Sequence, residues 1–246
     1  MDLLPPNLTG RIDVHSHLLP GVDDGCANVE DSVACARLFV EAGYSHVICT
    51  PHIWPNLSKN TTENIATWAA QLQHELALRQ VPLTLSHGGE LNLTPHHTQT
   101  PADSIVTYGG HGKYCLFDIW ADRLPPHFES GVKWLQSLGL TVIMAHPERL
   151  KAVQDDPGLV EYFVELGLLL QGNLYCLIES DLSPRIATRT AERFLRDGRY
   201  FILGSDCHKS ATLPVRFAGL RRAIDIVGRE AIDTLTMANP RKLLCS

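Results

Sequence analysis

Short apolar segments that end in a histidine or an acidic residue recur along this chain of 246 residues. Seven segments are rich in β-branched residues and alternate with longer amphipathic stretches, a pattern typical of βα units with parallel strands. We expect strands at 11–15, 45–50, 83–88, 114–119, 140–146, 168–173 and 200–206. Seven strands fit a closed or nearly closed α/β barrel, although an open doubly wound sheet would give the same alternation.

The stretches between these segments carry helix signals. The segment 28–43 begins at Asn28, a favourable N-cap residue, and ends at Gly43, which suits a helix C-terminus. Further helices are expected at 62–79 and 183–198. Because the chain has no repeat and no low-complexity linker, we predict a single domain over residues 1–246.

Composition and charge exclude several classes of protein. The net charge is −6 and no long basic run is present, so we expect no nucleic-acid partner. No apolar stretch approaches the roughly 18 to 20 residues that cross a bilayer, and the first residues lack the pattern of a signal peptide. We therefore expect a cytoplasmic protein without membrane insertion. The seven cysteines form no CxxC pair, which favours reduced thiols over disulfides or a zinc knuckle.

Potential metal ligands lie at the carboxyl ends of nearly all the expected strands, where barrel enzymes assemble their active sites. His15 and His17 are two residues apart, so they project to the same face of a strand and can bind one ion. Asp118 lies inside an apolar run, and a buried carboxylate is costly unless it is paired or bound to a cation. Asp206 and His208 repeat the two-residue spacing. The other candidates are His52, Glu90 and His146.

Taken alone, each of these residues has a simpler interpretation. Asp23 and Asp24 follow a Pro-Gly pair and are typical of a turn, and a single residue such as His52 is often a surface or capping histidine. Asp13 shares the face of the first two histidines, so we expect it to orient them. If all of these residues were ordinary turn, capping or surface residues, their placement at successive strand ends would be a separate coincidence each time. We therefore favour a site for several metal ions. Histidine and carboxylate ligands without thiolates suit Mn²⁺, Fe²⁺ or Zn²⁺.

The sequence motifs also resemble a known family. The segments DVHSHLLPGVDDG, CTPH, GGE, LFDI, AHPER, GSDCH and NPRKLL are similar to the polymerase and histidinol phosphatase superfamily. The similarity is strongest to its bacterial protein-tyrosine phosphatase branch, the capsule and exopolysaccharide regulators of the CpsB/YwqE type. It implies a distorted (β/α)₇ TIM-like barrel with three metal ions, usually manganese, at the C-terminal rim of the strands. It also implies hydrolysis of phosphotyrosine in proteins by a metal-bound hydroxide, with a bacterial tyrosine kinase as a possible partner.

The resemblance implies which residues hold the three ions. The first ion would be held by His15, His17 and Asp206. The second ion would be held by Glu90, which also bridges to the first, and by Asp118 and His146. The third ion would be held by Asp24, His52 and His208, which leaves Asp23 to form the turn. The family more often has glutamate at the position of Asp118, and the shorter side chain would draw its ion closer to the strand.

The resemblance also implies residues that contact the substrate. Arg149 matches an arginine that binds the substrate phosphate, and Arg216 is the candidate for a second one. Trp54 and Trp120 lie next to expected ligands and are candidates to flank the aryl ring, although aromatic residues at such places also serve as packing.

Other functions agree with part of this pattern. A histidinol phosphatase, or another small phosphomonoesterase of the same superfamily, would share the metal chemistry. A metal-dependent amidohydrolase also begins with HxH, but its site often uses a modified lysine where this chain has Glu90 and Asp118. A noncatalytic regulator would use its metals only for structure, and a structural site does not need three adjacent ions.

Overall fold

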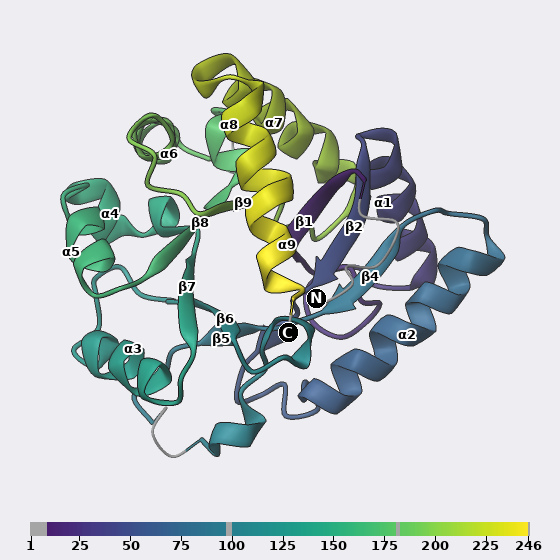
Figure 1. Ribbon diagram of the computed structural model, residues 1–246, viewed down its shortest axis with the longest axis horizontal. Helices are drawn as coiled ribbons and strands as arrows, with labels where there is room; N and C mark the ends of the chain where they lie inside the picture. The colour runs from purple at the N-terminus through teal and green to yellow at the C-terminus, as the bar shows by residue number, and fades with distance from the viewer. Residues whose placement is uncertain (1–8, 97–99, 181–182, 246) are drawn as a thin grey trace.

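The computed structural model describes residues 9–96, 100–180 and 183–245, and its centre is a curled parallel sheet. The strands are β1 (Arg11–Ser16), β2 (Tyr44–Cys49), β3 (His52–Ile53), β4 (Thr84–His87), β5 (Glu90–Asn92), β6 (Tyr114–Asp118), β7 (Thr141–Ala145), β8 (Leu169–Asn173) and β9 (Ile202–Gly204). Three strands pair in the order β1-β2-β4, and six pair in the order β3-β5-β6-β7-β8-β9. A parallel bridge from Ser16 to Cys207 joins the end of β1 to the segment after β9, so the sheet curls back on itself (Figure 1).

Two of the expected strands, β2 and β4, are each followed by a further short strand that was not predicted. β2 and β3 are separated by Thr50 and Pro51, and β4 and β5 by Gly88 and Gly89. A side chain on Gly89 would meet Ile53 at 2.8 Å, so only glycine fits where β4 bends into β5. β2 pairs with β4 and β3 pairs with β5, so the two short strands extend the pairing of the two strands before them. If each pair is counted as one run, seven strands remain, which confirms the predicted distorted barrel.

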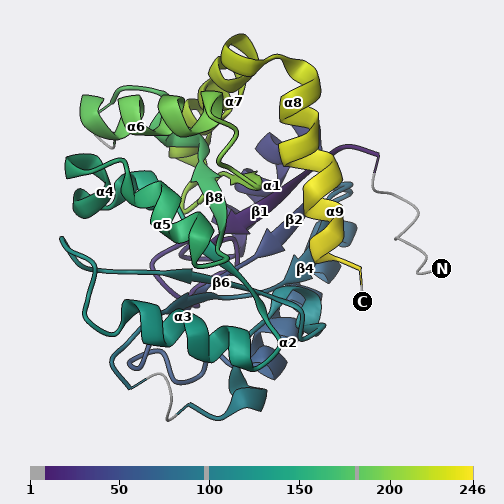
Figure 2. The same ribbon diagram turned by 60° about the vertical axis from the view of Figure 1, so that its left-hand side comes forward.

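Helices cover the outside of this barrel (Figures 1 and 2). They are α1 (Val29–Glu41), α2 (Thr62–Leu78), α3 (Phe128–Ser137), α4 (Lys151–Asp155), α5 (Leu159–Glu165), α6 (Arg185–Arg196), α7 (Leu213–Val227), α8 (Arg229–Asp233) and α9 (Asn239–Leu243). The side chain of Asn28 accepts a hydrogen bond of 2.9 Å from the Asp31 N–H, so it caps α1 as predicted. α2 and α6 confirm the other two expected helices.

Two apolar clusters stabilise the barrel. The larger one lies between the strands and the helices and includes Phe39, Leu72 and Phe117. The smaller one fills the barrel interior with Ile12, Val14, Ile48, Tyr108, Leu116, Ile143, Ala145, Ile202 and Leu243. Leu243 comes from α9, which therefore covers one end of the interior. Burial of these side chains contributes about 1.5–3 kcal/mol each, so the strand positions that support the rim are well determined.

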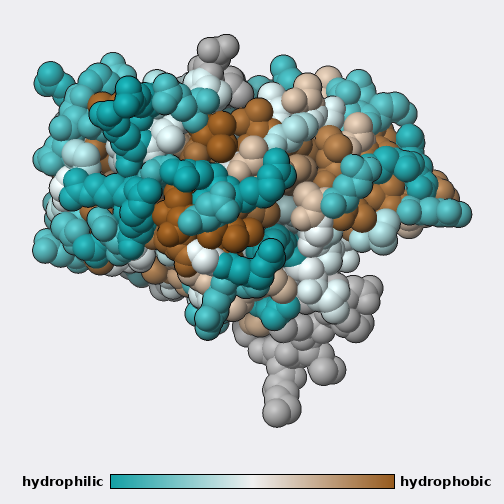
Figure 3. All heavy atoms as spheres, turned by 90° about the horizontal axis from the view of Figure 1, so that it is seen from above, coloured by the Kyte–Doolittle hydropathy of each residue, from teal (hydrophilic) through white to brown (hydrophobic). Residues whose placement is uncertain are grey.

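The outer surface shows no continuous apolar belt on the face drawn in Figure 3, which is mostly hydrophilic with apolar patches between hydrophilic ridges. Among the helices that the structure describes, none has the length and apolar character needed to cross a bilayer.

Candidate metal centre

The carboxyl ends of the strands converge on one polar cavity of about 250 Å³. It is lined by Asp24, His52, Glu90, Asp118, Trp120, His146, Arg149, Tyr175, Asp206, His208, Lys209, Thr212 and Arg216. His15 and His17 do not line the cavity and are fully buried. The cavity therefore gathers the other predicted ligands and both predicted arginines from segments that are far apart in the sequence.

Eight of the nine predicted ligands form three adjoining groups. In each group, one possible ligand atom from every residue lies within 4.8 Å of the others. The groups are His17, Asp24, His52 and His208; His15, Glu90 and His146; and His15, His17 and Asp206. Such spacing suits nitrogen and oxygen atoms that share a divalent ion at roughly 2.0–2.2 Å. Because His15 and His17 each belong to two groups, the arrangement suits neighbouring ions.

The carboxylate of Glu90 lies where these groups meet. Its Oε1 is 3.0 Å from His146 Nε2, and its Oε2 is 2.9 Å from His52 Nδ1 and 3.3 Å from His15 Nε2. Glu90 is 1 % exposed, so both oxygens are held inside the cluster. This position agrees with the predicted bridge between two ions.

Asp118 lies in the same cavity but belongs to none of the three groups. Its Oδ2 accepts a hydrogen bond from Trp120 Nε1, which turns the carboxylate toward that side chain. Burial and the nearby charge of Glu90 raise the pKa of Asp118 well above its ordinary value. A cation in the cavity would offset both effects.

Several polar atoms of this cluster are buried without a hydrogen-bond partner among the described residues. Asp118 Oδ1 is one of them, and Glu90 Oε2 and His52 Nδ1 lie 2.9 Å apart without forming a hydrogen bond. Buried polar atoms are rarely left unpaired, because removing them from water costs free energy that a partner must offset. Divalent cations would be suitable partners for the carboxylate oxygens, so the donor set fits a metal centre.

The two buried histidines at the end of β1, His15 in the strand and His17 just after it, are held by residues on other segments. His15 Nδ1 is 2.8 Å from Gln171 Oε1, and His17 Nδ1 is 2.7 Å from Asp23 Oδ2. A partner on the second ring nitrogen fixes the ring orientation and leaves the first nitrogen for a metal. The expectation that Asp13 orients these rings is wrong. Its carboxylate instead accepts hydrogen bonds of 2.7 and 2.9 Å from the N–H and Oγ of Ser205.

The structure separates the roles of the adjacent aspartates. The side chain of Asp23 is 1 % exposed and accepts hydrogen bonds of 3.0 Å from the N–H groups of Gly25 and His52. Asp24 is 59 % exposed, and its Oδ1 is 3.4 Å from His52 Nε2 and 3.5 Å from His208 Nε2. Asp23 thus makes the predicted turn and also positions His17, which the sequence did not indicate.

Two of the candidate ligands have an uncommon backbone conformation. His146 has φ of 33° and Asp206 has φ of 52°, in the left-handed region that non-glycine residues seldom occupy. Both follow the ends of strands, so the conformation turns their side chains into the cavity. Arg216 supports Asp206, because its Nη2 donates a hydrogen bond of 2.8 Å to the Asp206 carbonyl.

The two predicted arginines differ in their surroundings. Arg149 Nη1 donates a hydrogen bond of 3.0 Å to Asp206 Oδ2, and its side chain is 41 % exposed. Arg216 is 4 % exposed and also donates from Nε to Ser205 O and from Nη1 to Thr212 O. Both guanidinium groups lie against the ring of Tyr175, at 5.6 and 5.2 Å from its centroid. Arg149 is therefore the more accessible of the two to a molecule entering the cavity.

Negative charge in the cluster changes the protonation of its histidines. Burial alone would lower the pKa of His15, but the charges of Glu90 and Asp206 raise it to about 8. At His146 burial is the larger effect and lowers the pKa to about 4, with the charge of Arg149 acting in the same direction. Without a cation, His15 therefore holds a proton more readily than His146 does.

The predicted tryptophans lie together beside the cavity. The indole of Trp54 stacks on His52 with ring centroids 4.1 Å apart, and Trp120 meets Trp54 edge-on at 5.0 Å. Trp120 is 64 % exposed, so one of its faces is available to a ligand.

Residues that the sequence analysis did not select also contribute to the site. Tyr175, Lys209 and Thr212 line the cavity, and Asn173 Nδ2 donates a hydrogen bond of 2.8 Å to Asp206 Oδ2. Gln171 and Asn173 end β8, where an otherwise apolar segment becomes polar, and that change could have indicated them.

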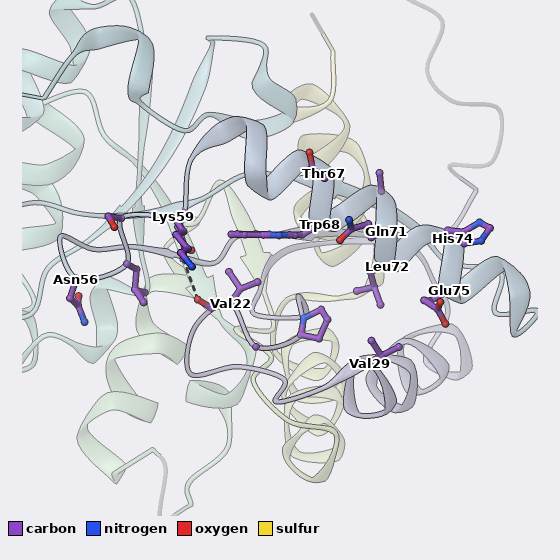
Figure 4. Close-up of a pocket in the computed structure, with 16 residues that line it drawn as sticks. Val22, Val29, Asn56, Lys59, Thr67, Trp68, Gln71, Leu72, His74 and Glu75 are labelled. Carbon is purple, nitrogen blue, oxygen red and sulfur yellow. Dashed lines mark hydrogen bonds between the residues drawn. The ribbon is translucent and has the colours of Figure 1, made fainter.

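A larger cavity, of about 1100 Å³, lies between α2 and the segment that leads into α1 (Figure 4). Val22, Val29, Trp68 and Leu72 give it apolar walls, and none of its lining residues is a predicted site residue. Asn60 donates from Nδ2 to the carbonyls of Val22 at 3.5 Å and His52 at 2.8 Å. One wall of this cavity is therefore tied to the segment that carries His52.

Comparison with known proteins places these features in a family. The family model described as capsular polysaccharide synthesis, CpsB/CapC, matches residues 11–245. The tyrosine-protein phosphatase YwqE of Bacillus subtilis (strain 168) is 32% identical over 160 residues, or 65% of this chain and 63% of the relative. This alignment therefore spans less than two thirds of that relative. The tyrosine-protein phosphatase CpsB of Streptococcus pneumoniae is 23% identical over 240 residues, or 95% of this chain and 98% of the relative.

Solved structures agree with the sequence comparison. A structure from a study of YwqE of Bacillus subtilis and CpsB of Streptococcus pneumoniae, described as unique metal-dependent tyrosine phosphatases, superposes with a TM-score of 0.84. It is 26% identical and covers 95% of this chain and 94% of its own. A structure engineered for organophosphate hydrolysis from a lactonase template gives a TM-score of 0.56 at 14% identity, which reflects the fold alone.

Proposed function

Because this chain belongs to the CpsB/CapC family of capsular polysaccharide synthesis, we propose that it hydrolyses phosphotyrosine in proteins with divalent metal ions as cofactors. The observation that carries this proposal is the set of three adjoining ligand groups at one cavity, with Arg149 at its edge. Several cations and an arginine are what a phosphate dianion requires inside a protein of net charge −6.

We assign three ions to the ligand groups, with Mn²⁺ as the first choice and Fe²⁺ or Zn²⁺ as alternatives. The first ion would be held by His15, His17 and Asp206, and Glu90 would bridge it to the second. The second would be held by Glu90, His146 and Asp118, and Asp118 would have to turn from Trp120 for this. The third would be held by Asp24, His52 and His208.

The remaining residues of the cavity would bind and orient the substrate. Arg149 would donate hydrogen bonds to the phosphate oxygens, and Asp206, which also accepts a hydrogen bond from Asn173, would keep the guanidinium in place. Arg216 would hold Asp206 in position by donating a hydrogen bond to its backbone carbonyl. Its remaining N–H groups would be offered to the phosphate. The faces of Trp54 and Trp120 would flank the tyrosine ring.

When bound, the ions would supply an activated water and neutralise the charge of the phosphate. The leaving group from phosphotyrosine is a phenolate with a pKa of about 10, so it needs less help from a general acid than an alkyl alcohol does. The cavity accordingly needs mainly positioning and positive charge, which Arg149 provides from the protein.

The family description connects the reaction with capsular polysaccharide synthesis. We infer that the substrates are phosphoproteins and that a bacterial tyrosine kinase is the partner that produces them. Such a kinase uses ATP, which would place both proteins in the cytoplasm.

The test is phosphate release by metal-stripped protein after addition of Mn²⁺, Fe²⁺ or Zn²⁺. Its substrates are a phosphotyrosine peptide, a phosphoserine peptide of the same sequence and histidinol phosphate. We expect metal-dependent release that is fastest from the phosphotyrosine peptide. Activity restricted to histidinol phosphate, or full activity without metal, would overturn the proposal. Asp197→Asn, at an exposed position at the end of α6, is the control variant, and we expect it to release phosphate as the wild type does.

A further inference from the structure

Beside the cavity of the metal centre lies a second one, of about 480 Å³, distinct from the larger cavity along α2. The two cavities share the lining residues Asp118, Trp120, His146 and Arg149. The second one continues away from the candidate ligands, along the segment that follows β6 and the segment that follows β7. Because β6 and β7 are paired neighbours, the loops at their carboxyl ends form facing walls.

The walls of this cleft combine an apolar floor with a charged mouth. Ile119 and Leu150 are each 8 % exposed and form the floor. Ala121, Asp122 and Lys151 are exposed and form the mouth. In Figure 2 the segment after β6 runs outward between α3 on one side and α4 and α5 on the other.

We propose that this cleft, lined by residues 119–122 and 150–151, binds the polypeptide segment next to the phosphotyrosine. The inference rests on the proposed function, since it assumes that the phosphate occupies the metal centre. A phosphotyrosine in a protein continues into backbone on both sides, and that backbone has to leave the first cavity. The cleft adjoins it and passes beside the accessible guanidinium of Arg149.

Trp120 marks the boundary between the two cavities and lines both. Its ring meets Trp54 edge-on with centroids 5.0 Å apart, and 64 % of the residue stays exposed. Exposed tryptophans are frequent anchors in protein recognition, because a rigid aromatic face gives contact area at little entropic cost. A tyrosine ring can lie on one side of Trp120 and the following residue on the other.

The charged residues at the mouth of the cleft suit the main-chain N–H and C=O groups of a peptide better than a ligand with a single charge. Asp122 can accept hydrogen bonds and Lys151 can donate them, which matches the N–H and C=O groups of an extended peptide. Lys151 is paired with Asp155, one turn further along α4, but both side chains are 58 % exposed. An ion pair at such exposure contributes little, so Lys151 can exchange its partner at low cost.

Filling the cleft gives the sharpest test. Ala121→Trp introduces a bulky side chain at an exposed position in the mouth, and Ala77→Trp makes the same change at an exposed position of α2 far from the site. The Mn²⁺-loaded proteins are compared on a phosphotyrosine peptide and on p-nitrophenyl phosphate, with kcat and KM measured separately. We expect Ala121→Trp to lower the ratio of kcat/KM for the peptide to kcat/KM for the small ester by about 10-fold or more, through KM. Ala77→Trp should leave that ratio as it is.

Lys151→Ala and its control Lys133→Ala extend the test, because Lys133 also pairs with a carboxylate four residues away on an exposed helix face. We expect a rise in peptide KM of about threefold for Lys151→Ala only. Equal loss on both substrates in Ala121→Trp, or no loss on either, would overturn the inference while the proposed function stands. If the wild-type protein with metal hydrolyses neither substrate, the proposed function itself fails.

Discussion

The interior of the barrel and the rim at the carboxyl ends of its strands are built from opposite kinds of side chain. In the interior, Ile12, Ile143 and Ile202 are fully buried and contact other apolar residues. At the rim, Glu90 is buried against three histidines, and the buried Asp118 has an oxygen without a hydrogen-bond partner among the described residues. The barrel therefore has an apolar interior layer and, at the carboxyl ends of its strands, a polar layer in which a buried oxygen lacks a hydrogen-bond partner.

This difference indicates how the barrel divides stability from function. The interior gains free energy from burial, whereas the rim keeps carboxylates and histidines close together at a cost. Left-handed backbone at His146 and Asp206 adds to that cost. Changes at the rim should therefore alter metal binding and catalysis more than folding, and changes in the interior should do the reverse.

The largest effect is expected from Asp206→Asn at the rim. It removes one negative charge from the group with His15 and His17 while keeping the side-chain shape. We expect activity on a phosphotyrosine peptide to fall by at least about 10³-fold, because an ion and the hold on Arg149 are both weakened. Steady-state kinetics and metal analysis of the purified protein measure this loss. A variant that keeps its metal content and its rate would break the division between rim and interior.

The next largest effect is expected from Ile143→Ala in the interior. It removes a fully buried side chain and leaves a cavity, so the free energy of unfolding should fall by about 3 kcal/mol. Denaturant unfolding of the metal-free protein measures this change, and activity per folded molecule should stay near that of the wild type. A stable variant with low activity would show that the interior acts on the chemistry directly.

A third effect is the pH dependence of the free energy of unfolding, which arises from a buried histidine outside the rim. His46 on β2 lies away from the rim, and burial lowers its pKa to about 4. The unfolded chain takes up this proton near pH 6.5 but the folded protein does not, so stability should fall as the pH drops from about 6.5 to 4. We expect wild type to lose about 2–3 kcal/mol more than His46→Gln over this interval. Parallel unfolding curves for the two proteins at all pH values would contradict the assignment.

The smallest effect distinguishes the adjacent aspartates of the rim. Asp23→Asn should weaken metal affinity by about 10- to 100-fold and leave the rate at saturating metal nearly unchanged, because Asp23 only orients His17. Asp24→Asn should lower the rate even at saturating metal, because Asp24 would hold an ion with His52 and His208. Titration of Mn²⁺ against activity separates the two outcomes, and identical curves for both variants would remove the distinction.

Much of the barrel was predictable because its strands and helices have clear local signals. β-branched runs gave all seven strands within two residues, and Asn28 gave the start of α1. The short strands β3 and β5 after Pro51 and after Gly88–Gly89 were not predicted, since two or three residues are too short to give a strand signal. The prediction of a single domain over 1–246 stays a prediction.

The site was less predictable, because its details depend on contacts between distant segments. Strand-end histidines and carboxylates predicted which residues meet, and eight of the nine predicted ligands fall into three groups. The partners of His15 and His17 were not predictable, because Gln171 lies 156 residues from His15 and Asp23 had a sufficient explanation as a turn residue. The hydrogen bond from Trp120 to Asp118 also depends on side-chain orientation, which spacing does not determine.

Whether three metal ions bind at the rim can be measured by anomalous diffraction from crystals of the Mn²⁺-loaded protein, because this method locates the ions themselves. We expect three peaks at the rim, at the groups of His15, His17 and Asp206, of Glu90 and His146, and of Asp24, His52 and His208. We also expect Asp23 to lie outside every coordination shell, in contact with His17. A rim without anomalous peaks, or an ion coordinated by Asp23 in place of Asp24, would contradict this placement of the ions.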